Sequence, residues 1–67
     1  MALTMRQWRR ARDYSQEYMA KKLNVHINTY MNWEKAPDKI KINYAKQIAD
    51  ILAVPMNEII FAKEVET

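Results

Sequence analysis

Apolar residues recur along this chain at separations of three and four, the spacing that places side chains on one face of a helix. The clearest stripe is expected to be buried and consists of Ile42, Ala45, Ile48, Ala49 and Leu52. No segment shows the alternation of apolar and polar residues that predicts a half-exposed strand. We therefore expect an all-α protein with five helices, at residues 5–12, 16–23, 27–35, 42–52 and 56–61.

Local signals support these helix starts. An apolar pair five residues apart flanks each start, which is the geometry of a hydrophobic staple. The pairs are Leu3/Trp8, Tyr14/Met19, Val25/Tyr30, Ile40/Ala45 and Val54/Ile59. Thr4 and Gln7 also form a capping box and Ser15 is a favoured N-cap, so the first two starts are the best specified.

Residues 16–35 have the pattern of a helix-turn-helix. Ala20 is small where two helices cross steeply, and Asn24 tolerates the left-handed φ needed at the turn. If Tyr30 and Trp33 pack inward, a rotation of about 100° per residue defines the outer face of the helix at 27–35. That face consists of Ile27, Asn28, Met31 and Asn32.

This uncharged outer face predicts contact with the major groove of double-stranded DNA. An asparagine amide pairs bidentately with adenine and isoleucine packs on a thymine methyl, each pairing contributing roughly 1–3 kcal/mol of discrimination. We therefore assign base reading to Ile27, Asn28 and Asn32. The two asparagines could also lie on an ordinary solvated helix. Two exposed apolar residues one turn apart, Ile27 and Met31, instead indicate a surface that a binding partner covers.

Donors to the DNA backbone are expected on both sides of this helix. The positive charge is concentrated in the N-terminal half of the chain, which contains this helix: residues 1–35 hold seven Lys/Arg and three Asp/Glu. The amide of Gln16 lies at a helix start, where free N–H groups also favour an anion. His26 either donates to a phosphate or caps its helix, and Thr29 either donates or makes no specific contact. The candidates are Gln16, His26, Thr29, Lys35, Lys39 and Lys41.

Arg9 in the first helix and Glu34 at the end of the third are expected to meet in a partly buried, bidentate ion pair. Such a pair would orient the third helix rather than touch bases. The alternative is that both are separate surface charges.

Composition excludes several other functions. The 67-residue chain has no cysteine, and its single histidine argues against a zinc site. It lacks an apolar run of about 18 residues, so we expect a cytoplasmic protein without membrane association. No carboxylate pair, nucleophile with base, or phosphate-binding glycine loop is present, so we expect neither an enzyme nor a cofactor, metal or small-molecule ligand.

Taken together, these residues resemble the Cro/C1-type (Xre-like) helix-turn-helix regulators of phages and bacteria, from about Leu3 to Phe61. The matching pieces are Trp8-Arg9, SQEYMAKKLNV at 15–25, TYMNWE at 29–34, IxxAxxIAxxLxV at 42–54 and MNEIIF at 56–61. The resemblance implies a compact, five-helix, lambda-repressor-like domain spanning residues 1–67, with its core at 3–61 and a flexible tail at 62–67. It also implies a phosphate contact for Gln16, base reading from the early third helix, and a brace between Arg9 and Glu34.

The chain departs from this family in having no glycine. The family commonly has glycine at the positions of Asp13, Asn24, Ala36 and Ala53. Asp13 and Asn24 tolerate left-handed φ, whereas alanine would be strained there by about 1 kcal/mol or more. We therefore expect the third and fourth helices to end differently from those of the family. The outer face also lacks the arginine or glutamine often found in the family, so its base preference is expected to differ.

The leading interpretation is a repressor-like or Cro-like regulator that binds pseudo-palindromic DNA as a homodimer, with recognition helices about 34 Å apart. The candidate dimer surface is the fifth helix, with Met56, Ile60 and Phe61. The alternative is a protein-binding module, such as an antitoxin or anti-repressor, in which Ile27 and Met31 contact a protein.

Overall fold

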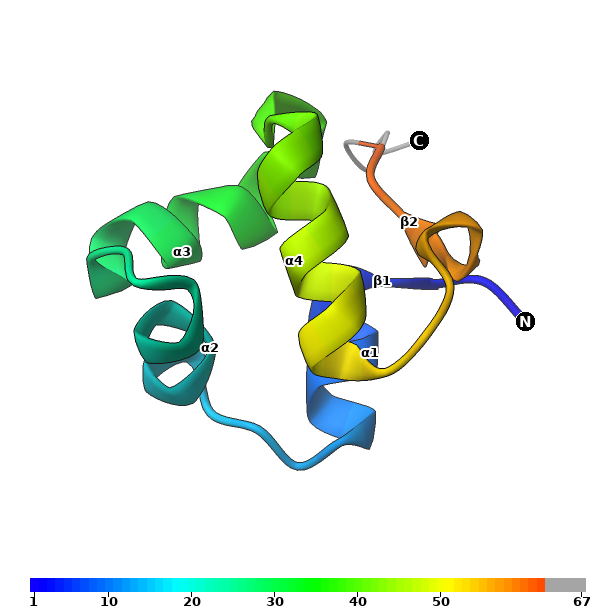
Figure 1. The fold of residues 1–67 in the computed structure, drawn as a ribbon, viewed down its shortest axis with the longest axis horizontal. Helices are drawn as coiled ribbons and strands as arrows, with labels where there is room; N and C mark the ends of the chain where they lie inside the picture. Colours follow the sequence, from blue (N-terminus) through cyan, green and yellow to red (C-terminus); the bar gives the residue numbers. More distant parts are fainter. Residues whose placement is uncertain (63–67) are drawn as a thin grey trace.

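The computed structural model describes residues 1–62, in which α-helices predominate (Figure 1). In chain order the elements are β1 (Leu3–Thr4), α1 (Met5–Ala11), α2 (Gln16–Leu23), α3 (Ile27–Lys35), the 3-10 helix η1 (Pro37–Lys39), α4 (Ile42–Leu52), the 3-10 helix η2 (Met56–Glu58) and β2 (Ile59–Ile60). The first four expected helices agree with α1 to α4 to within one residue. The expected flexible tail, apart from Ala62, lies outside the described residues.

The helix starts form where the capping residues predict them. The Thr4 side chain accepts from the Gln7 backbone N–H at 3.1 Å, and the Gln7 side chain accepts from the Thr4 N–H at 2.9 Å. Ser15 Oγ accepts from the Tyr18 N–H at 3.0 Å. Both caps satisfy backbone donors that the first turn of a helix leaves free. The capping box and the Ser15 cap are therefore confirmed.

The chain is mostly helical, as expected, but the fifth helix at 56–61 is not confirmed and the expectation that no strand forms is wrong. After η2 the chain extends into β2, which pairs in parallel with β1 in the register Leu3–Ile59 and Thr4–Ile60. The Trp8 indole N–H also donates to the Glu58 carbonyl at 2.7 Å. Strand pairing therefore satisfies backbone groups that a helix would have satisfied internally. The β-branched Ile59 and Ile60 also favour the extended backbone.

The core lies between the helices and beneath the strand pair. The largest fully buried side chains come from four helices and are Met5, Met19, Tyr30, Ile48 and Leu52. Burying an apolar side chain of this size contributes about 1.5–3 kcal/mol. Ala20 is buried in α2, which packs on both α3 and α4. Ile42 was expected in the core, but this expectation is wrong. Its side chain is 61% exposed, because the first residue of α4 projects beyond the core.

The helix ends agree with the expectations at Asp13, Asn24 and Ala36 but not at Ala53. Asp13 and Asn24 adopt left-handed φ of 62° and 57°, as their side chains permit. Ala36 has φ −135°, so α3 does end without a left-handed residue. Ala53, however, has φ 59° and caps α4 in the left-handed conformation, so the prediction that α4 ends differently is wrong.

The two helices of the helix-turn-helix, α2 and α3, lie on the side of the molecule opposite the β1–β2 pair (Figure 1). Within residues 1–62, no helix has the length and apolar character that a membrane span requires.

Candidate nucleic-acid interface

The orientation of α3 places its two asparagines in solvent. Tyr30 has no exposed surface and anchors the inner face of the helix. Trp33 is half-buried and its ring lies 4.8 Å from that of Tyr44. Asn28 and Asn32 are both exposed. Since residues four apart on a helix differ by about 40° in direction, the two amides share one face.

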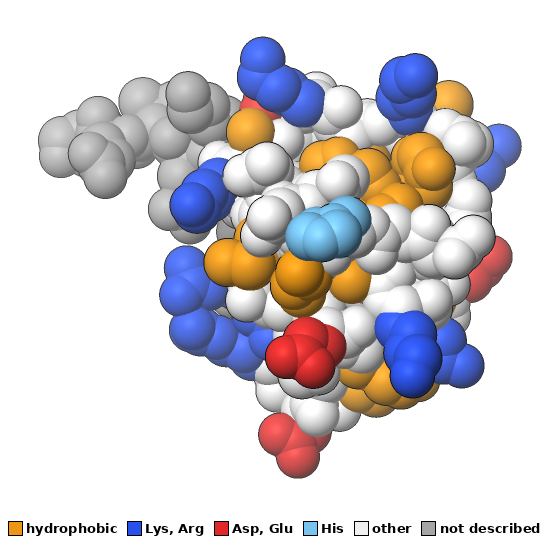
Figure 2. Space-filling view, turned by 90° about the vertical axis from the view of Figure 1, so that its left-hand side faces the viewer, with side chains coloured by type: hydrophobic (Ala, Val, Ile, Leu, Met, Phe, Trp, Pro, Cys, Tyr) orange, Lys and Arg blue, Asp and Glu red, His pale blue; other side chains and the backbone are white. Residues whose placement is uncertain are grey.

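The apolar residues beside these asparagines have different surroundings. Ile27 is half-buried and packs against the hydrophobic core, so it contributes only part of its side chain to the outer face. Met31 is also half-buried. Figure 2 views this side of the molecule and shows the histidine among uncharged and hydrophobic side chains, with an acidic side chain below them in this view and Lys and Arg mostly towards the edges. The centre of the face is therefore suited to base edges and methyl groups rather than to phosphates.

His26 caps the start of α3. Its Nδ1 accepts a hydrogen bond from the Asn28 backbone N–H at 3.1 Å. An accepting Nδ1 carries no proton, so the proton of the neutral ring is on Nε2. The side chain is exposed, and since its Nε2–H forms no hydrogen bond with residues 1–62, it can donate to an anion.

A buried carboxylate joins three helices behind this face. The Arg9 guanidinium from α1 donates through Nε to Glu34 Oε2 at 2.6 Å and through Nη2 to Oε1 at 3.3 Å. The Gln16 amide from α2 donates to Oε1 at 3.0 Å, and the Tyr30 hydroxyl donates to Oε2 at 2.7 Å. The Arg9 and Glu34 side chains are only 9% and 4% exposed. The expected bidentate pair is therefore present, within a larger network.

These contacts keep the carboxylate ionised. Burial raises the pKa of Glu34, but the hydrogen bonds from Arg9, Tyr30 and Gln16 outweigh burial and hold that pKa below its usual value. The hydrogen bond to Glu34 raises the pKa of Arg9. Burial, reinforced by the hydrogen bond to Glu34, raises the pKa of the Tyr30 hydroxyl far above its ordinary value. At neutral pH the network consists of one anion, one cation and neutral donors.

Sequence reasoning missed two members of this network. The spacing of Tyr30 and Glu34, four apart on one helix, was a signal that could have placed the hydroxyl near the carboxylate. The contact of Gln16 with Glu34 had no such signal, because it joins two different helices. Gln16 therefore already uses one amide N–H inside the protein, which leaves its second N–H for an outside acceptor.

The remaining candidates lie at or beyond the ends of α3. Thr29 is exposed on its first turn, and Lys35 is exposed at its last residue. Lys39 lies in η1 and Lys41 is the N-cap residue of α4, and both are exposed. Within residues 1–62 none of these three lysines forms an ion pair. Their ammonium groups are therefore available at the edge of the α3 face.

Comparison with known proteins agrees with this geometry. The family model described as helix-turn-helix matches residues 5–59, which covers α1 to α4 and reaches β2. No curated protein and no solved structure matches the chain.

Proposed function

Because the chain belongs to the Cro/C1-type helix-turn-helix family, we propose that it represses transcription by binding double-stranded DNA sequence-specifically, with α3 in the major groove. The observation that carries this proposal is the outward pair of Asn28 and Asn32 on a helix held from behind by the Glu34 network. A buried anchor limits the movement of α3, so the two amides meet base edges in a fixed register.

The proposed reading face prefers A·T-containing half-sites. Asn28 and Asn32 each have an amide that matches the donor and acceptor pair of adenine in the major groove. Ile27, with its exposed part, contacts a thymine methyl. The uncharged centre of this face lacks the arginine that most often reads guanine.

Phosphate contacts around this face would supply most of the affinity. The Nε2–H of His26 serves the start of α3, and Thr29 contributes its hydroxyl from the first turn. The second amide N–H of Gln16 serves the end of α3, where its first N–H binds Glu34, together with Lys35, Lys39 and Lys41.

A homodimer would provide the second half-site, because one α3 offers too few base contacts for tight specificity. The proposed dimer surface consists of Met56, Ile60 and Phe61. Ile60 is 39% exposed in β2, and the other two side chains are half-buried. The strand pair lies on the side opposite α2 and α3, so pairing there leaves both α3 helices free (Figure 1).

Selection of bound sites from random duplexes tests this proposal directly. We expect two A·T-containing half-sites in inverted repeat, one helical turn apart. Asn28→Ala and Asn32→Ala should each weaken binding to the selected site by roughly 1–3 kcal/mol. Gln47→Ala, which removes an exposed amide in α4, is the matched control and should bind as the wild type does. If no duplex is enriched, the regulator proposal is wrong and the protein-binding alternative is favoured.

A further inference from the structure

We propose that Arg6 and Arg10 form a second phosphate-binding surface on α1, which contacts the DNA backbone outside the groove occupied by α3. This inference rests on the proposed function, because it adds a contact to the same complex.

The arginines of α1 and its C-cap divide into two groups. This segment holds four arginines and no acidic residue. Arg9 pairs with Glu34. Arg12 Nε donates to the Leu52 carbonyl at 2.7 Å, and its guanidinium lies 5.4 Å from the centre of the Trp8 ring. These two arginines therefore stabilise the fold.

Arg6 and Arg10 have no such role. Both are exposed, and within residues 1–62 neither side chain forms a hydrogen bond or an ion pair. Four residues apart on a helix, they lie about 40° from one another, where like charges are destabilising by about 0.2–0.5 kcal/mol. The repulsion between the two arginines lowers the stability of the fold, and a bound polyanion would reduce that repulsion.

The position of the pair follows from the contacts of Arg9. Arg9 follows Arg6 by three residues and lies about 60° from it around α1. Its guanidinium reaches Glu34 in the last turn of α3, where Gln16 from the start of α2 also binds. Arg6 therefore borders the place where α2 and α3 present their phosphate donors, and Arg10 lies a further 40° from Arg9 around α1.

Duplex DNA is the partner that fits this arrangement. Its backbone carries one charge per roughly 1.7 Å of helix axis, so two guanidinium groups one helical turn apart both find a phosphate. Guanidinium also binds phosphate through two parallel hydrogen bonds. A contact of this kind carries no base information and would strengthen binding to all sequences alike.

A salt titration of the full chain with a fluorescent mixed-sequence duplex tests the inference. The measured quantity is the slope of log K against log salt over roughly 50–200 mM. The double variant Arg6→Gln/Arg10→Gln should have a slope shallower than that of the wild type by about 1.8, or about 0.9 for each phosphate that the variant no longer binds. Arg6→Lys/Arg10→Lys should retain the wild-type slope, which would show that the positive charge of the two side chains determines the slope.

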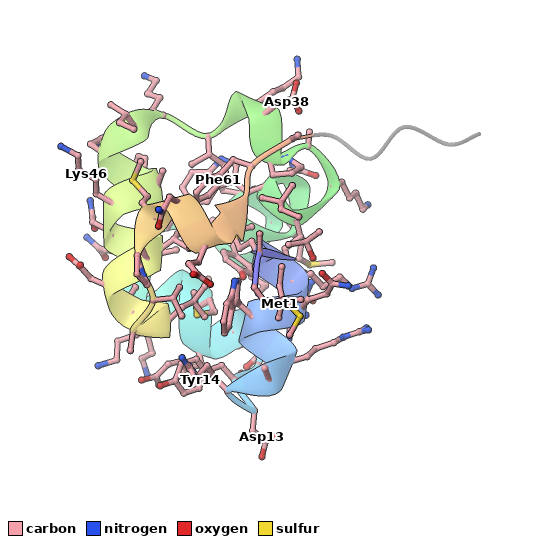
Figure 3. All side chains as sticks on the ribbon, turned by 90° about the vertical axis from the view of Figure 1, so that its right-hand side faces the viewer. Met1, Asp13, Tyr14, Asp38, Lys46 and Phe61 are labelled. Carbon is pink, nitrogen blue, oxygen red and sulfur yellow. The ribbon has the colours of Figure 1, made fainter. Side chains whose placement is uncertain are left out.

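Lys46→Gln is the matched control. It removes one charge, half the number that the double arginine variant removes, from a side chain on α4 that lies on the side opposite α1 (Figure 3). It should leave the slope unchanged. A slope shallower by about 0.9 in Lys46→Gln, the same change per charge as in the arginine variant, would show that only net charge matters and would overturn the proposal.

The other outcomes separate this inference from the proposed function. If the wild type shows no salt-dependent binding, both fail. If the wild type binds and the Arg6→Gln/Arg10→Gln variant keeps the full slope while its circular dichroism melt is unchanged, only this inference fails. If the two arginines are needed for binding poly-glutamate but not DNA, the surface docks an acidic protein and the proposal is wrong.

Discussion

Gln16 and Glu34 are joined by a hydrogen bond of 3.0 Å, which ties the first turn of α2 to the last turn of α3. The same carboxylate accepts hydrogen bonds from the Arg9 guanidinium in α1 and from the Tyr30 hydroxyl in α3 itself. One buried anion therefore fixes the relative positions of the three helices that present the candidate DNA-binding face. The stability of the fold should respond to the removal of any of these partners.

Arg9 and Glu34 should be strongly coupled in stability. Arg9→Met leaves the carboxylate without its cation, and Glu34→Gln leaves the guanidinium without its anion, so each should cost about 3–5 kcal/mol. The double variant Arg9→Met/Glu34→Gln buries no charge and should lose less than the sum of the two. Urea denaturation measures all three, with Arg10→Met as an exposed control that should change stability by less than about 0.5 kcal/mol. Additive losses would contradict a specific pair.

Acid should destabilise the protein through Glu34. Its pKa in the folded state is lower than in the unfolded chain, where the ordinary value is 4.5. The stability it contributes is therefore complete above about pH 4.5 and is lost as the pH falls through the folded pKa. Denaturation midpoints measured from neutral pH downwards should fall less steeply below that point in Glu34→Gln than in the wild type. Parallel acid profiles for the two proteins would rule out this contribution.

The Tyr30 hydroxyl should stabilise the network at neutral pH. Tyr30→Phe removes one donor to a charged acceptor and should cost about 1.5–3 kcal/mol. Tyr44→Phe is the matched control, since the hydroxyl of Tyr44 forms no hydrogen bond within the described residues. Because the folded pKa of Tyr30 is raised, its contribution is complete below about pH 10 and declines as the pH rises further. The difference between Tyr30→Phe and the wild type should therefore shrink in alkali.

Replacing Ala53 with glycine should stabilise the protein. Ala53 has φ 59° and ψ 43°, a conformation that costs an L-residue roughly 1–2 kcal/mol. Glycine adopts it freely but loses more entropy on folding, so the net gain in the free energy of unfolding should be about 0.5–1 kcal/mol. The matched control is Ala36→Gly at the end of α3, where φ is −135° and no such strain exists. Thermal melts should show a higher midpoint for Ala53→Gly alone, and a gain in both variants would contradict this explanation.

The elements that sequence patterns predicted well are those determined by neighbours within a few residues. The bounds of α1 to α4 followed from apolar spacing, and the starts at Thr4 and Ser15 followed from side chains that reach only three residues along the chain. The same is true of Asn24, whose own side chain permits the left-handed turn. The inward position of Tyr30 followed from the helical period once α3 was recognised.

Tertiary structure decided what depends on residues distant in the chain. Residues 56–61 had a helix-like apolar pattern, but β1 offered backbone partners that local spacing does not reveal, so they became η2 and β2. Gln16 joined Glu34 only because α1, α2 and α3 converge on one carboxylate. Ala53 accepts a strained φ because the chain must turn there to bring β2 to β1. The sequence by itself therefore determined the helices and their caps, whose free energies are local. The strand pair and the Glu34 network required the fold, because their stabilisation appears only when distant segments meet.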